Sequence, residues 1–208
     1  MDDKETGRVE AFSDGVFAVA ITLLVLNIHG LTDPTKPLPD ADLLTFLSNQ
    51  WPTYLAFVTS FATIGVMWMN HHRLFTHITR VDTNLFALNL LLLLVIVFIP
   101  FPTALLASYI THPEDHYAAL LYSGTNILLA ISFYLLWRYA SHNNRLLDEK
   151  SDKKSVDAIT NQYRYGPLFY VITFILAIIY VPASIGAALL LAGFFALPGR
   201  RARSSSDN

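Results

Sequence analysis

Histidine and carboxylate side chains gather in two places along this sequence, which raises the question of a metal site. Three histidines lie close to one aspartate, at His71, His72, His77 and Asp82, and the stretch HPEDH at 112–116 adds two more histidines beside two carboxylates. Imidazole and carboxylate groups are ligands of zinc, copper and iron, so an integral-membrane metal oxidase is one function to consider. That chemistry requires the ligands to converge on one ion, which depends on the elements that carry them.

A second pair of polar groups lies in an apolar run, FSDGVFAVAITLLVL at 12–26, where Asp14 is near the start and Thr22 in the middle. An uncompensated aspartate deep in a bilayer costs ~2.5 to 3.5 kcal/mol on insertion scales, so Asp14 needs a partner or a position at the headgroups. The Thr22 hydroxyl has an ordinary role, a bond back to the carbonyl one turn earlier, and a functional one, contact with an ion or water.

The composition places these groups in a membrane protein. The chain has 208 residues, of which 53% are hydrophobic and only 14% charged, and its mean hydropathy is +0.43. A bilayer core of ~30 Å needs roughly 20 apolar helical residues, and stretches without ionisable side chains occur at 15–28, 43–70, 83–111, 117–137 and 165–199. Each of the first four predicts one span, whereas Pro182 within VPASIG divides the fifth into two short spans joined by a tight hairpin.

The sequence therefore predicts an all-α, polytopic membrane protein with six transmembrane helices, at about 13–30, 50–72, 83–109, 116–137, 165–181 and 184–199. Two prolines in IPFP, at 99–102, should bend or end the third helix. The charged segment 143–164 is predicted to be a connector that is at most partly helical. We expect one channel domain over 1–199 and a basic, serine-rich, disordered tail at 200–208.

Positive charge predicts the orientation. Thirteen of the fourteen lysines and arginines fall in the segments on one side, and only Lys36 falls on the other. By the positive-inside rule both termini face the cytoplasm, as an even number of spans also requires, and we expect a multi-pass protein of the cell membrane. His71 and the 112–116 stretch then lie on opposite sides of the bilayer and cannot share an ion, so we predict no enzyme and no resident cofactor. A divalent ion held outside by His112, Glu114 and His116, with His29 as a further candidate ligand, stays open beside the commoner case of solvated loop residues.

The first helix has two different faces. At ~100° per residue, Val19, Leu23 and Leu26 fall within roughly 60° of one another with Thr22 at one edge, while Asp14 points away. Asp14 has two interpretations: it caps the helix N-terminus, or it is held by Arg8 and by donors from the segment WMNHHRLF at 68–75.

Several residues of the first three predicted spans form motifs that resemble those of a known family. The first span begins with Arg-x-x-x-Phe-Ser-Asp, as Arg8, Phe12, Ser13 and Asp14, and the second ends with Trp-x-x-His-x-Arg-Leu-Phe, as Trp68, His71, Arg73, Leu74 and Phe75; the third holds Asn89 and Pro100. Over residues 8–102 the chain resembles the transmembrane protein 175 family of potassium channels, known from endosomes and lysosomes and, in single-repeat form, from prokaryotes.

The resemblance implies a homotetramer in the lipid bilayer whose first helices line a pore for potassium and other monovalent cations, without nucleic acid as a partner. It places the hydrophobic constriction on Val19, then Leu23 and Leu26, and potassium preference on Thr22, while Asp14 with Arg8 and the cluster near His71 anchors the helix. Relatives often carry isoleucine or leucine where this chain has Val19. No Thr-Val-Gly-Tyr-Gly filter stretch occurs, in keeping with a pore that lacks a re-entrant loop.

Two other interpretations stay open. A proton-coupled carrier of ions or small solutes normally places an ionisable group near the bilayer midplane, and none of the six predicted spans has one there. This favours a potassium-preferring channel with passive conduction. A lone bundle that buries the Val19, Leu23 and Leu26 stripe as an ordinary core is the other alternative.

Overall fold

A computed structural model describes residues 3–28, 43–112, 114–148 and 151–196, and nearly all of them are helical. The all-α class is confirmed for this part of the chain. The elements are α1 (Asp3–Leu23), the 3-10 helix η1 (Leu24–Asn27), α2 (Leu43–Asn49), α3 (Trp51–Phe75), α4 (Thr83–Phe98), α5 (Pro100–Tyr109), α6 (Asp115–Ser141), the 3-10 helix η2 (His142–Asn144), α7 (Lys153–Ile179) and α8 (Val181–Ala196).

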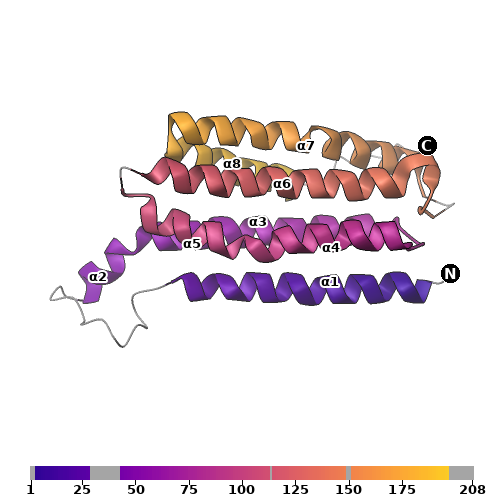
Figure 1. The fold of residues 1–208 in the computed structure, drawn as a ribbon, viewed down its shortest axis with the longest axis horizontal. Coiled ribbons are helices and arrows are strands. Elements are labelled where there is room, and N and C mark those ends of the chain that lie inside the picture. The colour runs from indigo at the N-terminus through magenta and orange to yellow at the C-terminus, as the bar shows by residue number, and fades with distance from the viewer. Residues whose placement is uncertain (1–2, 29–42, 113, 149–150, 197–208) are drawn as a thin grey trace, which may run out of the picture.

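The long helices lie side by side in one bundle, and α1 runs along its edge (Figure 1). Helix α1 packs on α3 and α4, while α6, α7 and α8 form the opposite side of the bundle. The N-terminal end of α1, the connection from α3 to α4, the C-terminal end of α6 and the start of α7 all meet at one end of the bundle, which is also where α8 ends (Figure 1). The segments predicted to carry positive charge are thus brought to a common end.

Among the described residues, five helical stretches are long and apolar enough to cross a membrane, with α4 and α5 together forming the third. The shorter apolar helix α8 has 16 residues and is therefore about 24 Å long, less than the ~30 Å of a bilayer core. Six crossings and the cytoplasmic position of both termini stay predictions.

Prolines interrupt the helices where the sequence predicts it. Helix α4 ends at Phe98 and α5 begins at Pro100, so the expected break at IPFP is confirmed. The expected hairpin is also present: α7 ends at Ile179, Tyr180 is extended at φ −158° and ψ 100°, and α8 begins directly at Val181. A proline early in a helix costs little because its missing N–H would have no intrahelical acceptor.

Two helices begin ten or more residues before their predicted starts. Helix α7 begins at Lys153 rather than near 165, because the Asp152 carboxylate accepts hydrogen bonds from the N–H groups of Lys154 and Ser155 and so caps it. Much of the predicted connector is therefore helix. Helix α1 begins at Asp3, ten residues earlier than predicted, and the short helix α2 was not predicted at all.

Candidate pore-lining helix

One face of α1 holds the helix on the bundle. Ser13, Phe17, Ala20 and Leu24 recur at helical spacing and are between 0% and 1% exposed. The helix is thus seated along its length on α3 and α4.

The opposite face of α1 is left open by the subunit. Val19 is 54% exposed, Leu26 63% and Leu23 36%, and Thr22 between them is also exposed. The interpretation of this stripe as the ordinary core of a lone bundle is therefore wrong for the single subunit. Apolar side chains exposed along a membrane-length helix need lipid, another protein surface or a narrow aqueous path beside them.

The end of this stripe has a local geometry that the sequence did not predict. The α-helix stops at Leu23, and Leu26 lies on η1, a tighter 3-10 turn. The Thr22 hydroxyl donates its hydrogen to the Val19 carbonyl oxygen at 2.9 Å. This is the ordinary role of a membrane threonine, and it leaves the lone pairs of the exposed Thr22 oxygen available to a cation or to water.

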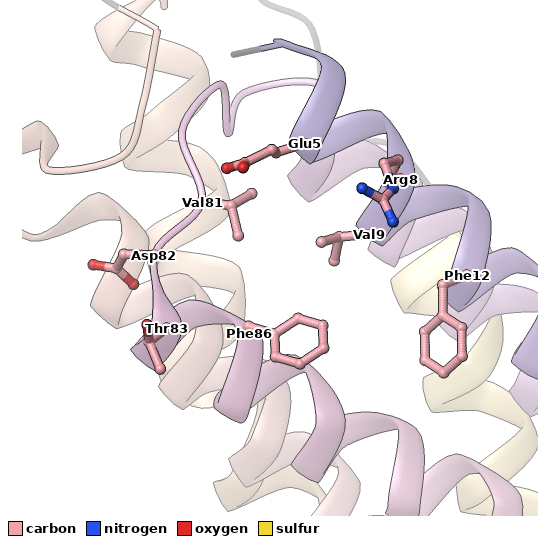
Figure 2. Close-up of a pocket in the computed structure, with 8 residues that line it drawn as sticks. All are labelled: Glu5, Arg8, Val9, Phe12, Val81, Asp82, Thr83 and Phe86. Atoms are coloured by element: carbon pink, nitrogen blue, oxygen red, sulfur yellow. The ribbon is translucent and has the colours of Figure 1, made fainter. Parts of the chain in front are cut away.

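Asp14 lies well inside α1, so its interpretation as the N-cap of the first helix is wrong. Its carboxylate instead accepts a hydrogen bond from the Trp68 indole N–H at 2.8 Å. The expected contact between Asp14 and the 68–75 segment is thereby confirmed. Arg8 is not part of it: among the described residues Arg8 makes no hydrogen bond or ion pair, and it points into a groove beside α4 (Figure 2).

A second contact joins the same two helices one turn nearer the helix N-terminus. The His72 Nδ1 atom lies 2.6 Å from a Glu10 carboxylate oxygen. Because α1 and α3 run antiparallel, the pair Glu10 and Asp14 faces the pair His72 and Trp68, four residues apart on each helix. That matched spacing is visible in the sequence and would have predicted the contact.

A buried chain of hydrogen bonds ties α1 to both neighbours. The Asn89 side-chain N–H group donates to the Ser13 hydroxyl oxygen at 2.9 Å, and the Ser13 hydroxyl donates to the Val9 carbonyl at 2.8 Å. The Asn89 side-chain oxygen then accepts from the Nε2–H group of His71 at 2.9 Å. All three side chains are fully buried, so the chain lies out of water.

Aromatic rings hold His71, the histidine of this hydrogen-bond chain, in place. The His71 ring stacks on Phe75 with centroids 4.4 Å apart, and its other neighbour is Phe17 of α1 at 5.4 Å. Since Ser13 and Phe17 belong to the buried face of α1, these contacts fix the rotation of α1 about its own axis. The Val19 and Thr22 stripe must then point away from the bundle.

The histidine and carboxylate side chains considered as metal ligands do not form a cluster in the part of the chain that the structure describes, where no three such groups converge. The His112 and His116 rings lie beside Tyr109 and Tyr117, with centroids 5.6 and 4.0 Å apart.

The fold and the open stripe together define a polytopic α-helical membrane protein. In it, α1 is fixed against the bundle by one face, and the opposite, apolar face of α1 is exposed. A family model described as the endosomal/lysosomal potassium channel TMEM175 matches residues 8–100. A potassium channel of Chamaesiphon minutus is 50% identical over 196 residues, which cover 94% of this chain and 96% of that protein. The chain belongs to the TMEM175 family.

Two further comparisons extend this relationship. The crystal structure of a lysosomal potassium-selective channel TMEM175 homolog from Chamaesiphon minutus superposes with a TM-score of 0.84 at 47% identity, covering 95% of this chain and all of that chain. The human endosomal/lysosomal proton channel TMEM175 is 37% identical over 138 residues, which are 64% of this chain but 27% of the human protein. Channels of this family, rather than enzymes, are the relatives of this chain.

Replacing the central amide of the buried chain tests its contribution to stability. Asn89→Leu keeps a similar volume but leaves the His71 Nε2–H group buried without an acceptor, which should lower the free energy of unfolding by about 1 to 3 kcal/mol. Thermal unfolding of the purified protein in detergent measures the change. The matched control is Asn84→Leu, since Asn84 donates to the Tyr139 hydroxyl at an exposed site. Equal melting temperatures for the two variants would contradict the assignment.

Proposed function

We propose that the protein is a potassium-preferring cation channel whose pore is lined by the exposed face of α1 from several copies. The observation that carries this proposal is that α1 has two opposite faces, one buried in the subunit and one exposed. The buried face is fixed by the Ser13, Asn89 and His71 chain, and the opposite face presents Val19, Thr22, Leu23 and Leu26 outside the subunit. The relatives named potassium channels support the choice of ion.

The constriction is built from aliphatic side chains. Rings of Val19, Leu23 and Leu26 around a shared axis make a narrow neck that water leaves readily, so small rotations of α1 open it or dewet it. Val19 and Leu26 are the more exposed of the three, and Leu23 is turned partly toward the subunit. We assign the first constriction to the Val19 layer, where the family resemblance places it, followed by Leu23 and Leu26.

Thr22 supplies oxygen atoms next to that neck. Its hydroxyl hydrogen is occupied by the Val19 carbonyl, so the side chain faces the axis as an acceptor. A ring of such oxygens replaces part of the hydration shell of a potassium ion, directly or through held water, at lower cost than for the more strongly hydrated sodium ion.

The assembly is a homotetramer in the cell membrane, in which each subunit contributes six spans and keeps both termini in the cytoplasm. Helix α8 is the sixth span, and local thinning of the bilayer accommodates its length. Asp14, Trp68 and the buried chain position the pore helix and do not contact the permeant ion. The connections that carry positive charge lie at one end of the bundle, which supports the cytoplasmic position of both termini.

Flux from liposomes tests the function. The purified protein in vesicles with a potassium gradient should pass potassium passively, with a rate that rises with the gradient and without coupled proton movement. A pH-sensitive dye inside the vesicles reports protons, which matters because vertebrate relatives are named proton channels. Saturable uptake of potassium or of a small solute that requires a proton gradient would reject the channel in favour of a carrier.

Widening the constriction should increase conduction. Val19→Ala removes two methyl groups from each copy and widens the apolar ring one turn from Thr22, so we expect a larger single-channel conductance or leak. Recording from planar bilayers measures it. The matched control is Leu94→Ala, because Leu94 is an aliphatic residue that is 67% exposed on a different helix, α4. A conductance that changes equally in the two variants would place the constriction elsewhere.

Removing the hydroxyl layer should reduce ion preference. Thr22→Val preserves the branched shape of the side chain but removes its oxygen, so the preference for potassium over sodium should fall, whereas Thr22→Ser should retain most of it. Reversal potentials under bi-ionic conditions measure the preference. If Thr22→Val kept the reversal potential of the unmodified chain, Thr22 would not determine selectivity.

A further inference from the structure

Two connections that are far apart in the sequence bind each other at the end of the bundle where α1 begins (Figure 1). They are residues 76–82, between α3 and α4, and residues 142–148, which follow α6. Ile78 and Leu147 form an antiparallel bridge between them, and backbone hydrogen bonds of 3.0 Å flank this bridge on both sides. We call the two bound connections the clasp.

The second connection of the clasp is a tight turn with a buried end. Asn143 and Asn144 take left-handed backbone conformations, at φ 55° and 52°, which asparagine adopts more readily than most residues. After this turn the chain buries Leu147, which is 1% exposed, as is Ile78 opposite it. The clasp is therefore a packed unit of defined shape.

The Asp82 carboxylate closes the clasp. It caps α4 by accepting a hydrogen bond from the Leu85 N–H group at 2.8 Å, and it accepts a second one from the Tyr139 hydroxyl of α6 at 2.7 Å. The Arg145 guanidinium lies 3.7 Å from the carboxylate and 4.9 Å from the centroid of the Tyr139 ring. Asp82 thus joins the start of α4 to the end of α6, and its carboxylate points away from α1 (Figure 2).

This carboxylate is charged at neutral pH. Burial alone would raise the pKa of Asp82, but the hydrogen bonds from Leu85 and Tyr139 and the charge of Arg145 outweigh burial and lower the pKa below its ordinary value. Asp82 therefore remains an acceptor for the Tyr139 hydroxyl at neutral pH.

The clasp also holds α1, at the first turn of that helix. The Thr6 hydroxyl donates a hydrogen bond to the Thr79 carbonyl oxygen of the clasp at 3.2 Å, and Thr6 is buried. Thr6 precedes Ser13 by seven residues, close to two helical turns, so both hydroxyls lie on the buried face of α1. Helix α1 is therefore attached at two positions about 10 Å apart, through Ser13 to Asn89 and through Thr6 to the clasp.

We propose that the clasp positions α1 and so determines how long the pore stays open, with Thr6, Asp82 and Tyr139 as positioning residues. This rests on the proposed function, in which small rotations of α1 open or dewet the neck. A helix attached at one position can tilt and turn about it, whereas a second attachment two turns away restrains both motions. Through Tyr139, α6 takes part in holding α1, although α1 itself packs on α3 and α4.

Removing one hydroxyl should loosen the clasp without changing its packing. Tyr139→Phe deletes the donor to Asp82, so the mean open time in single-channel recordings should fall several-fold. The unitary conductance and the bi-ionic reversal potential should stay unchanged, because the pore face of α1 is not altered. The matched control is Tyr165→Phe on α7, since Tyr165 also lies under an arginine, with the Arg164 guanidinium carbon 5.9 Å from its ring centroid.

The contact between α1 and the clasp provides an independent test. Thr6→Val preserves the side-chain shape but removes the hydroxyl, so it should shorten the open time, whereas Thr6→Ser should retain most of it. Once α1 is detached, the state of the clasp no longer matters, so adding Tyr139→Phe to Thr6→Val should have little further effect. Two reductions that multiply in the double variant would reject the clasp as one unit. Should Tyr139→Phe fail to fold, the two Thr6 variants decide.

A reversible covalent bond separates positioning from folding, because the chain has no cysteine of its own. The neighbours of Ile78 and Leu147 make the backbone hydrogen bonds of the bridge, and paired residues of this type have Cα atoms ~4.5 Å apart, within reach of a disulfide. In the triple variant Ile78→Cys, Leu147→Cys, Tyr139→Phe, oxidation should restore long openings, and a reductant should shorten them again in the same membrane patch.

The outcomes distinguish this proposal from the channel function. If the unmodified protein conducts potassium, but Tyr139→Phe and Thr6→Val open for as long as it does, the clasp does not position α1 and the channel stands. A disulfide that forms by mass spectrometry without lengthening the openings of the triple variant would also overturn the proposal. If the unmodified protein passes no potassium in vesicles, the proposed function fails and the gating role of the clasp fails with it.

Discussion

The orientation of α1 depends on a chain of hydrogen bonds that lies out of contact with water. Ser13, Asn89 and His71 come from three helices, and each satisfies polar groups that would cost about 1 to 3 kcal/mol if left buried and unpaired. Hydrophobic contact alone would let an apolar helix rotate, since one aliphatic face packs much like another. The polar chain instead permits one rotation, and this specifies which side chains leave the bundle.

Two further polar contacts beside the buried hydrogen-bond chain also hold α1 in its orientation. Trp68 and His72 hold Asp14 and Glu10, so α1 is attached to α3 through two successive turns. A carboxylate near the end of a membrane helix is costly without partners, and here the cost is offset by a donor from the neighbouring helix. The same contacts thus help to position the proposed pore helix on the subunit.

Much of the fold could be predicted because it follows from composition and backbone chemistry. Long uncharged stretches identified the membrane helices, and the prolines at 100, 102 and 182 marked both interruptions. The start of α7 was missed because a charged segment resembles a loop until the Asp152 cap is considered. The exposed stripe was predicted from periodicity, but periodicity cannot say whether such a stripe is covered within the subunit. The groove beside α4 into which Arg8 points could not be predicted, since residues 5–12 and 81–86, which line it, are far apart in the sequence.

In the proposed channel, the Thr22 face of α1 borders water on the conduction path. Silver ion or a small charged thiol reagent, applied to Thr22→Cys channels in a bilayer, tests this most directly, because the chain has no cysteine of its own. We expect modification to block the potassium current of this variant and to leave the current of Leu94→Cys channels unchanged. A current that persists in Thr22→Cys channels after mass spectrometry confirms complete modification would contradict it.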